Sequence, residues 1–304
     1  MNIMLNNNNE KKKFRAGFIA IVGAPNVGKS TLLNQVLGEK ISITSRKPQT
    51  TRNRIVGIVH RPNSQLIFID TPGIHRARRS LNIRIVDAAL SALGDVDVVL
   101  VMIDVEKPDP ESEAFLVTKL KKQKRPVVLA LNKIDLIEKP ELLSIIDSWS
   151  KSYAFEAIIP ISAILGHQID GLLDAMEALL PESPPLYSDH ALTDMPERFI
   201  AAEMIREKVF RLTGQEIPYA TAVTVESFSE ERKNLVKIHA TIHVERTSQK
   251  GMIIGKNGSR LKMIGTEARK EIERMVGTKV YLKLFVRVHK NWSKDTKALR
   301  RFGY

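Results

Sequence analysis

The chain has 304 residues, 43 % of them hydrophobic and none of them cysteine, which is enough for about two domains and excludes disulfides, thiolate metal sites and cysteine catalysis. No apolar run approaches the roughly 18 residues that a membrane span needs, and the lack of cysteine suits a reducing cytosol. The formal net charge of +13 is concentrated in residues 246–304, which contain 16 Lys and Arg but only 4 Asp and Glu. This concentration indicates a surface that binds a polyanion, with nucleic acid as the first candidate and an anionic membrane surface as the second.

The first part of the chain has the pattern of an α/β domain. Residues 1–13 are rich in Asn and then in Lys, without the apolar core of a signal peptide, and we expect a short flexible extension. Apolar runs then alternate with helical patterns over residues 14–181, and a helix near Ile169–Leu180 closes this part. The expected strands are Phe18–Val22, Ile55–His60, Leu66–Asp70, Val96–Asp104, Pro126–Asn132 and Ala157–Ser162. Near-continuous apolar strands that alternate with helices predict a doubly wound, mostly parallel sheet covered on both faces.

Residues 23–30 read GAPNVGKS, a complete GxxxxGKS phosphate-binding loop. The loop lies between the first expected strand and a helical stretch, and this setting separates it from a chance glycine-rich turn. Backbone N–H groups of such a loop wrap a polyphosphate, while Lys29 would neutralise the outer phosphates and the Ser30 hydroxyl would bind Mg²⁺. The expected nucleotide contacts here are Gly23, Asn26, Val27, Gly28, Lys29, Ser30 and Thr31.

A DTPG motif follows the third expected strand. Asp70 could hold Mg²⁺ through a water while the Gly73 N–H meets the γ-phosphate, as the corresponding groups do in nucleotide hydrolases with a phosphate-binding loop. The motif is weak alone, and an ordinary turn is the alternative. Its place on the next pair of apolar strands after the phosphate loop favours the functional interpretation.

An NKID motif ends the fifth expected strand. The Asp135 carboxylate could accept hydrogen bonds from guanine N1–H and the exocyclic amine together, whereas adenine would leave it unpaired. The stem of Lys133 would pack along the base, and Asn132 would tie this segment to the phosphate loop. Ser162 and Ala163, after the last strand, would supply a backbone N–H to guanine O6. All these motifs follow the carboxyl ends of strands, where ligands of such sheets bind.

GAPNVGKS, DTPG, NKID and SA, in this order, resemble the motif series of translation-factor-related GTPases. The resemblance implies GTP, GDP and Mg²⁺ as ligands and a first switch at Thr50 and Thr51. Of the two we prefer Thr51, because related switches place Thr directly before Arg. It further implies that Lys29, Thr51 and Gly73 surround the reacting phosphate and that Ser30, Thr51 and Asp70 hold the metal.

The residue after Gly73 is Ile74, where many small GTPases have a Gln that orients the attacking water. Ile74 has no group for this task, so we expect slow intrinsic hydrolysis, with other groups or a partner positioning the water. Asn26 matches a loop Asn that in some relatives helps to bind a potassium ion; a role in stabilising the loop is the alternative.

The second part of the chain follows a Pro-rich break, and we expect a linker at 182–196 and a domain at 197–304. Its expected elements are a helix at Glu197–Leu212, strands at Ala220–Phe228 and Leu235–Val244, a helical pair, and a last strand at Val280–Val288. The order α-β-β-α-α-β predicts a smaller α+β domain.

A GxxG loop joins the helical pair of this domain. In its basic α-β-β-α-α-β setting it resembles a type II KH domain, whose loop clamps about four nucleotides of single-stranded RNA. A helix–turn–helix corner is the alternative. Apolar residues before the loop would form the floor for the bases. The expected RNA-binding residues are Ile253, Ile254, Gly255, Lys256, Asn257, Gly258 and Arg260.

A GTPase domain with this switch, followed directly by a KH domain, resembles the Era family of bacterial ribosome-assembly GTPases from about Phe14 to the end of the chain. Residues 40–52 (KISITSRKPQTTR) and 289–293 (HKNWS) strengthen the resemblance. It implies binding of the 3′ end of small-subunit ribosomal RNA and a role in maturation of that subunit, by a monomer in the cytoplasm or peripherally at the inner face of the membrane. An RNA-binding assembly factor with a mainly structural GTPase domain and a membrane-surface GTPase are the alternatives.

Overall fold

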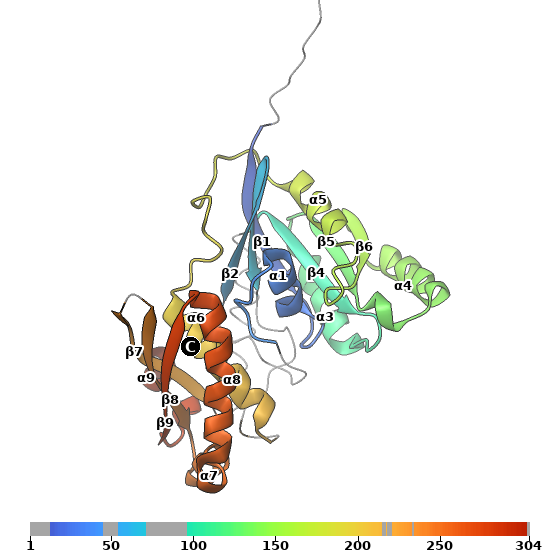
Figure 1. Cartoon of the computed structure of the whole chain (residues 1–304). Helices are drawn as coiled ribbons and strands as arrows, with labels where there is room; N and C mark the ends of the chain where they lie inside the picture. Colours follow the sequence, from blue (N-terminus) through green and yellow to red (C-terminus); the bar gives the residue numbers. More distant parts are fainter. Residues whose placement is uncertain are drawn as a thin grey trace, which may run out of the picture.

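The computed structural model describes residues 13–44, 54–70, 96–214, 217, 221–232 and 234–302. These residues form two separate sheets, each with its own helices (Figure 1). The first sheet has six strands in the order β2-β3-β1-β4-β5-β6, and only β2 runs antiparallel to its neighbour. Its strands are β1 (Arg15–Val22), β2 (Ile55–Arg61), β3 (Ser64–Asp70), β4 (Val98–Asp104), β5 (Val127–Asn132) and β6 (Ala157–Ile161).

Helices cover both faces of this sheet, as its continuous apolar strands predict. Those within the described residues are α1 (Lys29–Leu37), α3 (Pro110–Leu120), α4 (Lys139–Ser152) and α5 (Ile169–Leu179). Ile19 and Ile21 of β1 pack with Leu32 of α1 and with α5, whereas the alternate residues Ala20 and Val22 pack with α3 and α4. The doubly wound, mostly parallel fold is thereby confirmed, and it aligns the carboxyl ends of β1, β3, β4, β5 and β6 along one edge.

The segment expected to be a linker lies against the edge of the first sheet (Figure 1). The Ile58 N–H of β2 donates to Leu192 O at 2.9 Å, and Gln65 Oε1 of β3 accepts the N–H groups of Leu186 and Tyr187 at 2.7 and 2.9 Å. An open strand edge is a site for unwanted pairing, and this segment covers part of it. The segment thus connects the two sheets while being held against the first.

The second sheet has the order β7-β8-β9, with β7 and β8 antiparallel and β8 and β9 parallel. Its elements are α6 (Glu197–Leu212), β7 (Ala222–Arg232), β8 (Leu235–Val244), α7 (Thr247–Ile254), α8 (Ser259–Val276), β9 (Lys279–Val288) and α9 (Thr296–Arg301). Ile264, Ala268 and Ile272 recur along α8 at helical spacing and are fully buried in the core. The predicted order α-β-β-α-α-β is confirmed as far as β9.

A further helix, α9, follows β9, so the expectation that the strand at Val288 is the last element is corrected. Trp292 is fully buried and packs with Leu299 and Phe302 against Ala222 of β7. The sequence signal was weak because α9 has only six residues and reads TKALRR, too short and too polar for a helical period to stand out.

Helix α6 is buried almost all round, including four of its charged residues. These are Glu203, Arg206, Glu207 and Lys208. The guanidinium of Arg206 donates to both carboxylate oxygens of Glu203, at 2.7 and 2.6 Å. Buried charges of this kind require partners, and some of the partners of Glu207 and Lys208 come from outside the helix. None of the helices in the described part of the chain is both long and apolar enough to cross a membrane.

Candidate functional site

The phosphate loop connects the end of β1 to the start of α1 and depends on glycine. Gly28 caps α1 with φ 105°, and a Cβ on it would stand 2.2 Å from Nδ2 of Asn132. Asn26 also adopts a left-handed conformation, with φ 67°. Any side chain at position 28 would therefore push the NKID segment away from the phosphate loop.

Lys29 lies inside the loop, only 6 % exposed. Its Nζ donates to the backbone carbonyl oxygens of Gly23 and Ala24, at 3.1 and 2.8 Å. Burial lowers the pKa of Lys29 to about 8, while the Asp70 carboxylate acts in the opposite direction. A buried ammonium held by two neutral carbonyl oxygens is ready to exchange them for phosphate oxygens.

Ser30 and Asp70 meet at the edge of the sheet. Ser30 Oγ donates to Asp70 Oδ2 at 2.7 Å, and Asp70, at the end of β3, is fully buried. Mg²⁺ prefers oxygen ligands such as a hydroxyl and a carboxylate, so this donor set fits the expected metal. Ser42, which no motif indicated, donates to the same Asp70 oxygen at 2.9 Å.

Asn132 joins three loops, as its predicted tie to the phosphate loop requires. Its Nδ2 donates to Val27 O at 2.7 Å, and its Oδ1 accepts the Ala163 N–H at 2.9 Å. The Ser162 N–H donates to His167 O at 3.3 Å. Both N–H groups of the SA pair are therefore engaged within the protein, and either would have to leave its acceptor to reach guanine O6.

Lys133 and Asp135 lie at the end of β5, beside the Asn132 junction. Lys133 adopts φ 72°, and its Nζ pairs with Asp104 at the end of β4. Asp135 lies in the short 3₁₀ helix Ile134–Leu136 and is exposed. Asp104 was missed from the sequence because an Asp that ends a strand without a flanking motif has no distinguishing pattern.

Three residues of the predicted site, Thr50, Thr51 and Gly73, lie outside the described residues, as does the neighbouring Ile74. Their roles stay predictions. The described groups that lie together at one edge are the phosphate loop, Asp70, the NKID segment and the SA pair.

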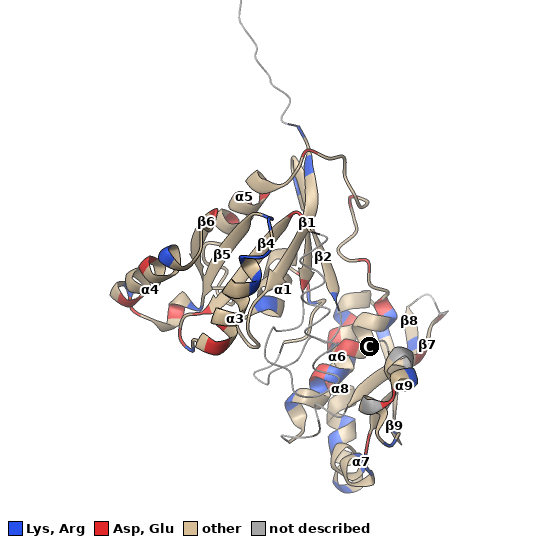
Figure 2. Cartoon of the chain, turned by 180° about the vertical axis from the view of Figure 1, so that it is seen from behind, with Lys and Arg blue, Asp and Glu red and all other residues tan. Residues whose placement is uncertain are grey.

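The GxxG loop of the second sheet also depends on its glycines. Gly255 has φ 72° and Gly258 φ 76°, and a Cβ on Gly255 would stand 2.8 Å from the Cβ of Arg260. Lys256 and Asn257 between them are exposed. The loop leads directly into α8, and Figure 2 shows Lys and Arg along α8 and around α7.

The other predicted RNA contacts differ in exposure. Ile253 is fully buried in the core, whereas Ile254 is partly exposed and the neighbouring Met252 is 51 % exposed. Arg260 Nη1 donates to Met252 O at 2.6 Å, which holds the guanidinium near the loop. On this surface Ile254 and Met252, rather than Ile253, expose apolar area, so the expectation that Ile253 lines the floor for the bases does not fit its burial.

Two family models match this chain. A model described as a 50S ribosome-binding GTPase matches residues 18–133, and a KH domain model matches residues 216–293. The GTPase Era of Geotalea uraniireducens (strain Rf4) is 53 % identical over 294 residues, which cover 97 % of this chain and 99 % of that protein. The chain belongs to the Era GTPase family.

Other Era proteins agree in sequence and in fold. The GTPase Era of Geobacter sp. (strain M21) is 55 % identical over 295 residues, with 97 % of this chain and 99 % of that protein covered. An Aquifex aeolicus Era variant bound to GDP.AlF4⁻ has a TM-score of 0.91 and 41 % identity, covering 96 % of this chain and 99 % of that one. An Era structure in complex with MgGDPNP and nucleotides 1506–1542 of 16S ribosomal RNA has the same values. The predicted Era resemblance is thus confirmed, and the chain is a GTPase with a KH domain.

Proposed function

We propose that this Era-family chain is a GTP-controlled switch that binds the single-stranded 3′ end of small-subunit ribosomal RNA and assists maturation of the small ribosomal subunit. The observation that supports this best is the joining, in one chain, of a nucleotide site built at the carboxyl ends of four strands with an exposed GxxG loop. The Era structure with MgGDPNP and a 16S ribosomal RNA segment supports the RNA class.

In this proposal the groups around the phosphates act by position and charge. Lys29 leaves the Gly23 and Ala24 carbonyl oxygens and binds the outer phosphates. Ser30 and Asp70 hold Mg²⁺, which when bound neutralises charge on the phosphates. Thr51 and Gly73 complete the shell around the γ-phosphate, and hydrolysis is slow because Ile74 offers no group to orient water.

Guanine selectivity comes from Asp135, which accepts hydrogen bonds from the N1–H and the exocyclic amine. Lys133, fixed by Asp104, packs its stem along the base, and Asn132 keeps the base loop in register with the phosphate loop. Ser162 or Ala163 supplies the N–H for guanine O6 after releasing its present acceptor.

The RNA clamp comprises the GxxG loop and Arg260, with Ile254 as its apolar floor. Lys256 and Asn257 meet the phosphates in this proposal, which is supported by their exposure and by the two flanking glycines that let a backbone approach closely. We assign residues 14–181 to the GTPase domain, 182–196 to the linker and 197–304 to the KH domain; the two separate sheets support this division.

Four finer assignments, on oligomeric state, location, potassium and the membrane, belong to the same proposal. The protein acts as a monomer in the cytoplasm, and Asn26 contributes to a potassium site at the phosphate loop. Peripheral association with the inner face of the membrane would use the same basic surface as RNA. Sedimentation with anionic vesicles, compared with RNA binding at matched salt, separates these two polyanions.

The test of the switch is RNA affinity in two nucleotide states. We expect a 3′-end RNA to bind more tightly with a non-hydrolysable GTP analogue than with GDP. The log affinity should fall with log salt by about 0.7 per phosphate contact on a single strand. Equal RNA affinity in both states would refute the switch.

A further inference from the structure

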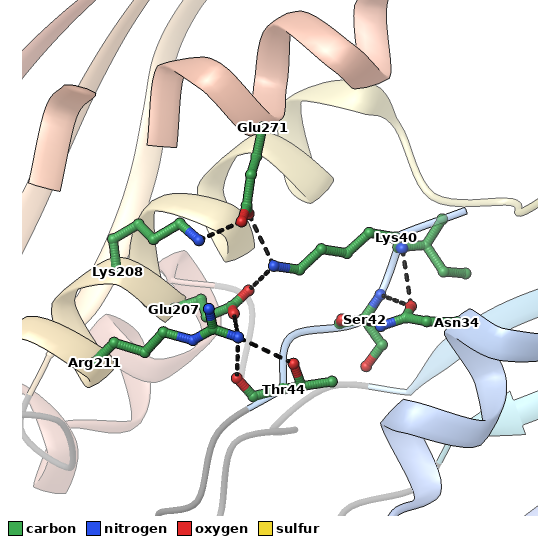
Figure 3. Close-up of polar contacts among 9 residues, drawn as sticks. Asn34, Lys40, Ser42, Thr44, Glu207, Lys208, Arg211 and Glu271 are labelled. Carbon is green, nitrogen blue, oxygen red and sulfur yellow. Dashed lines mark hydrogen bonds and ion pairs between the residues drawn. The ribbon is translucent and has the colours of Figure 1, made fainter. Parts of the chain in front are cut away.

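A five-residue segment that follows α1 contacts both the nucleotide site and two helices of the second domain, α6 and α8, which we call the KH helices. We call Lys40–Thr44 the connector; it comes directly before the segment that contains Thr51. Figure 3 shows its side chains directed to two sides, with Lys40 and Thr44 toward α6 and α8, and with Asn34 of α1 holding Ser42 from the other side. The connector is the part of the chain in which a GTPase-domain loop meets charged groups of the second domain.

On the KH side, Lys40 pairs with two carboxylates from different helices. Its Nζ lies 2.6 Å from Glu207 Oε2 of α6 and 2.8 Å from Glu271 Oε2 of α8 (Figure 3). Glu207 is fully buried, and Glu271 also pairs with Lys208. Because Glu207 is fully buried, loss of the Lys40 contact removes one of its two cationic partners and should cost more than loss of a surface ion pair.

The pKa of Glu271 reflects its pairing with these two lysines. Burial by itself would raise the pKa of Glu271, but its bonds with Lys208 and Lys40 outweigh burial and leave the pKa below the ordinary value. A second link lies nearby, where Arg211 pairs with Glu207 and donates to the backbone and hydroxyl oxygens of Thr44, both at 3.3 Å. Both ends of the connector therefore contact the KH helices.

On the GTPase side, the middle of the connector is held by one side chain. Asn34 Oδ1 accepts the N–H groups of Ile41 and Ser42 at 3.0 and 2.9 Å, and its Nδ2 donates to Ser42 O at 2.7 Å. Ser42 is fully buried and donates its hydroxyl to Asp70 Oδ2 at 2.9 Å. A shift of the connector therefore moves a donor away from the carboxylate that fits Mg²⁺.

We propose that Ser42 is a positioning residue for Asp70. The carboxylates of Glu207 and Glu271 fix the position of Ser42 because they hold Lys40 at the start of the connector. This inference rests on the proposed GTPase and Mg²⁺ roles of Asp70. Docked KH helices hold the connector, and the connector holds Asp70 in its metal-binding position. This coupling is reciprocal: the factor by which docking of the KH helices strengthens binding of a nucleotide with Mg²⁺ is also the factor by which that nucleotide favours docking.

The first test measures guanine-nucleotide affinity with Mg²⁺ and with EDTA. The ratio of the two affinities reports the metal-dependent part of binding. Because a hydrogen bond to a charged group is at stake, Ser42→Ala should lower this ratio by about tenfold. Ser144→Ala, the same change on the exposed face of α4, should leave the ratio unaltered. An unaltered ratio in Ser42→Ala would overturn the positioning role.

The second test asks whether Lys40 acts through Ser42. Lys40→Met should lower the same ratio when Ser42 is present and have little further effect in Ser42→Ala, since contributions that share one path are not additive. Lys151→Met, which removes an equal charge from an exposed pair, is the control. Equal effects in both backgrounds would show that Lys40 acts independently. Glu271→Gln replaces Lys40→Met if that variant melts early.

The third test measures amide hydrogen exchange of the connector in the absence of metal. In EDTA, hydrogen exchange of the Ile41 and Ser42 amides should accelerate about tenfold in Lys40→Met but not in Lys151→Met, because the local opening that exposes these amides becomes easier. Unchanged exchange would overturn the link to the KH helices. If the unaltered protein bound no guanine nucleotide, the proposed function would fall instead, and the exchange result would still report on the connector.

Discussion

At the scale of single residues, the site depends on a few buried charges whose partners change when a ligand binds. Lys29 is the clearest case, because its ammonium is buried and held by two neutral carbonyl oxygens. Burial lowers the pKa of Lys29 to about 8, from an ordinary 10.5. Between these values the folded state holds fewer protons on Lys29 than the unfolded chain, so the contribution of this group to stability rises with pH.

Lys29 therefore predicts proton uptake on nucleotide binding. Phosphates beside the amine favour its charged form, so binding at pH 8.5 should take up part of a proton, and nucleotide affinity should fall as the pH rises above 8. Calorimetry in two buffers of different ionisation enthalpy measures the uptake, with pH 7 as the control. Equal heats in the two buffers at pH 8.5 would contradict the assignment.

Asp135 predicts base selectivity. Asp135→Asn replaces an acceptor-only carboxylate by an amide that cannot accept both guanine N–H groups, so the preference for GTP over ATP should fall by at least about tenfold per lost hydrogen bond. Competition of the two nucleotides for one site gives the ratio. Asp147→Asn, on the exposed face of α4, is the matched control. An unchanged preference would remove Asp135 from the base site.

At the scale of elements, local pattern predicted most of the fold. The strands of the first sheet were recognisable because their apolar runs are nearly continuous, and β1 with α1 because the phosphate loop separates them. A few strands begin or end at other residues than expected. Strand β4 starts at Val98 rather than Val96, and β7 continues to Arg232 rather than Phe228. The bond from Ser42 to Asp70 was not predictable, since it joins residues 28 positions apart and neither a motif nor a period marks it.

The loop between α7 and α8 predicts a separable RNA function. Changing Lys256 and Asn257 to Asp places negative charge where phosphates would lie, and RNA affinity should fall by at least about tenfold while GTP affinity is retained. Changing Ser150 and Lys151 to Asp makes the same charge change on α4 and should have a much smaller effect on RNA binding. Loss of GTP binding in the loop variant would mean that the loop is a structural corner.

At the scale of the whole molecule, the two sheets are linked by buried charge. The sequence predicted two domains in the correct order, but not that α6 would be buried almost all round, because Glu207 and Lys208 are residues typical of an exposed helix face. Their burial is possible because each has an opposite charge beside it: Lys40 reaches Glu207 from the first domain, and Glu271 of α8 pairs with Lys208 within the second. Charged contacts between distant segments are the part of this molecule that periodicity and motifs do not reveal.

A molecule linked in this way should couple its two ligands reciprocally. If a GTP analogue raises the affinity for RNA by some factor, RNA must raise the affinity for the analogue by the same factor. The most direct measurement is the affinity for a non-hydrolysable GTP analogue with and without saturating 3′-end RNA, at one salt concentration. We expect the GTP analogue to bind more tightly in the presence of RNA, and GDP to show no such gain. Equal gains for GTP analogue and GDP, or none for either, would contradict it.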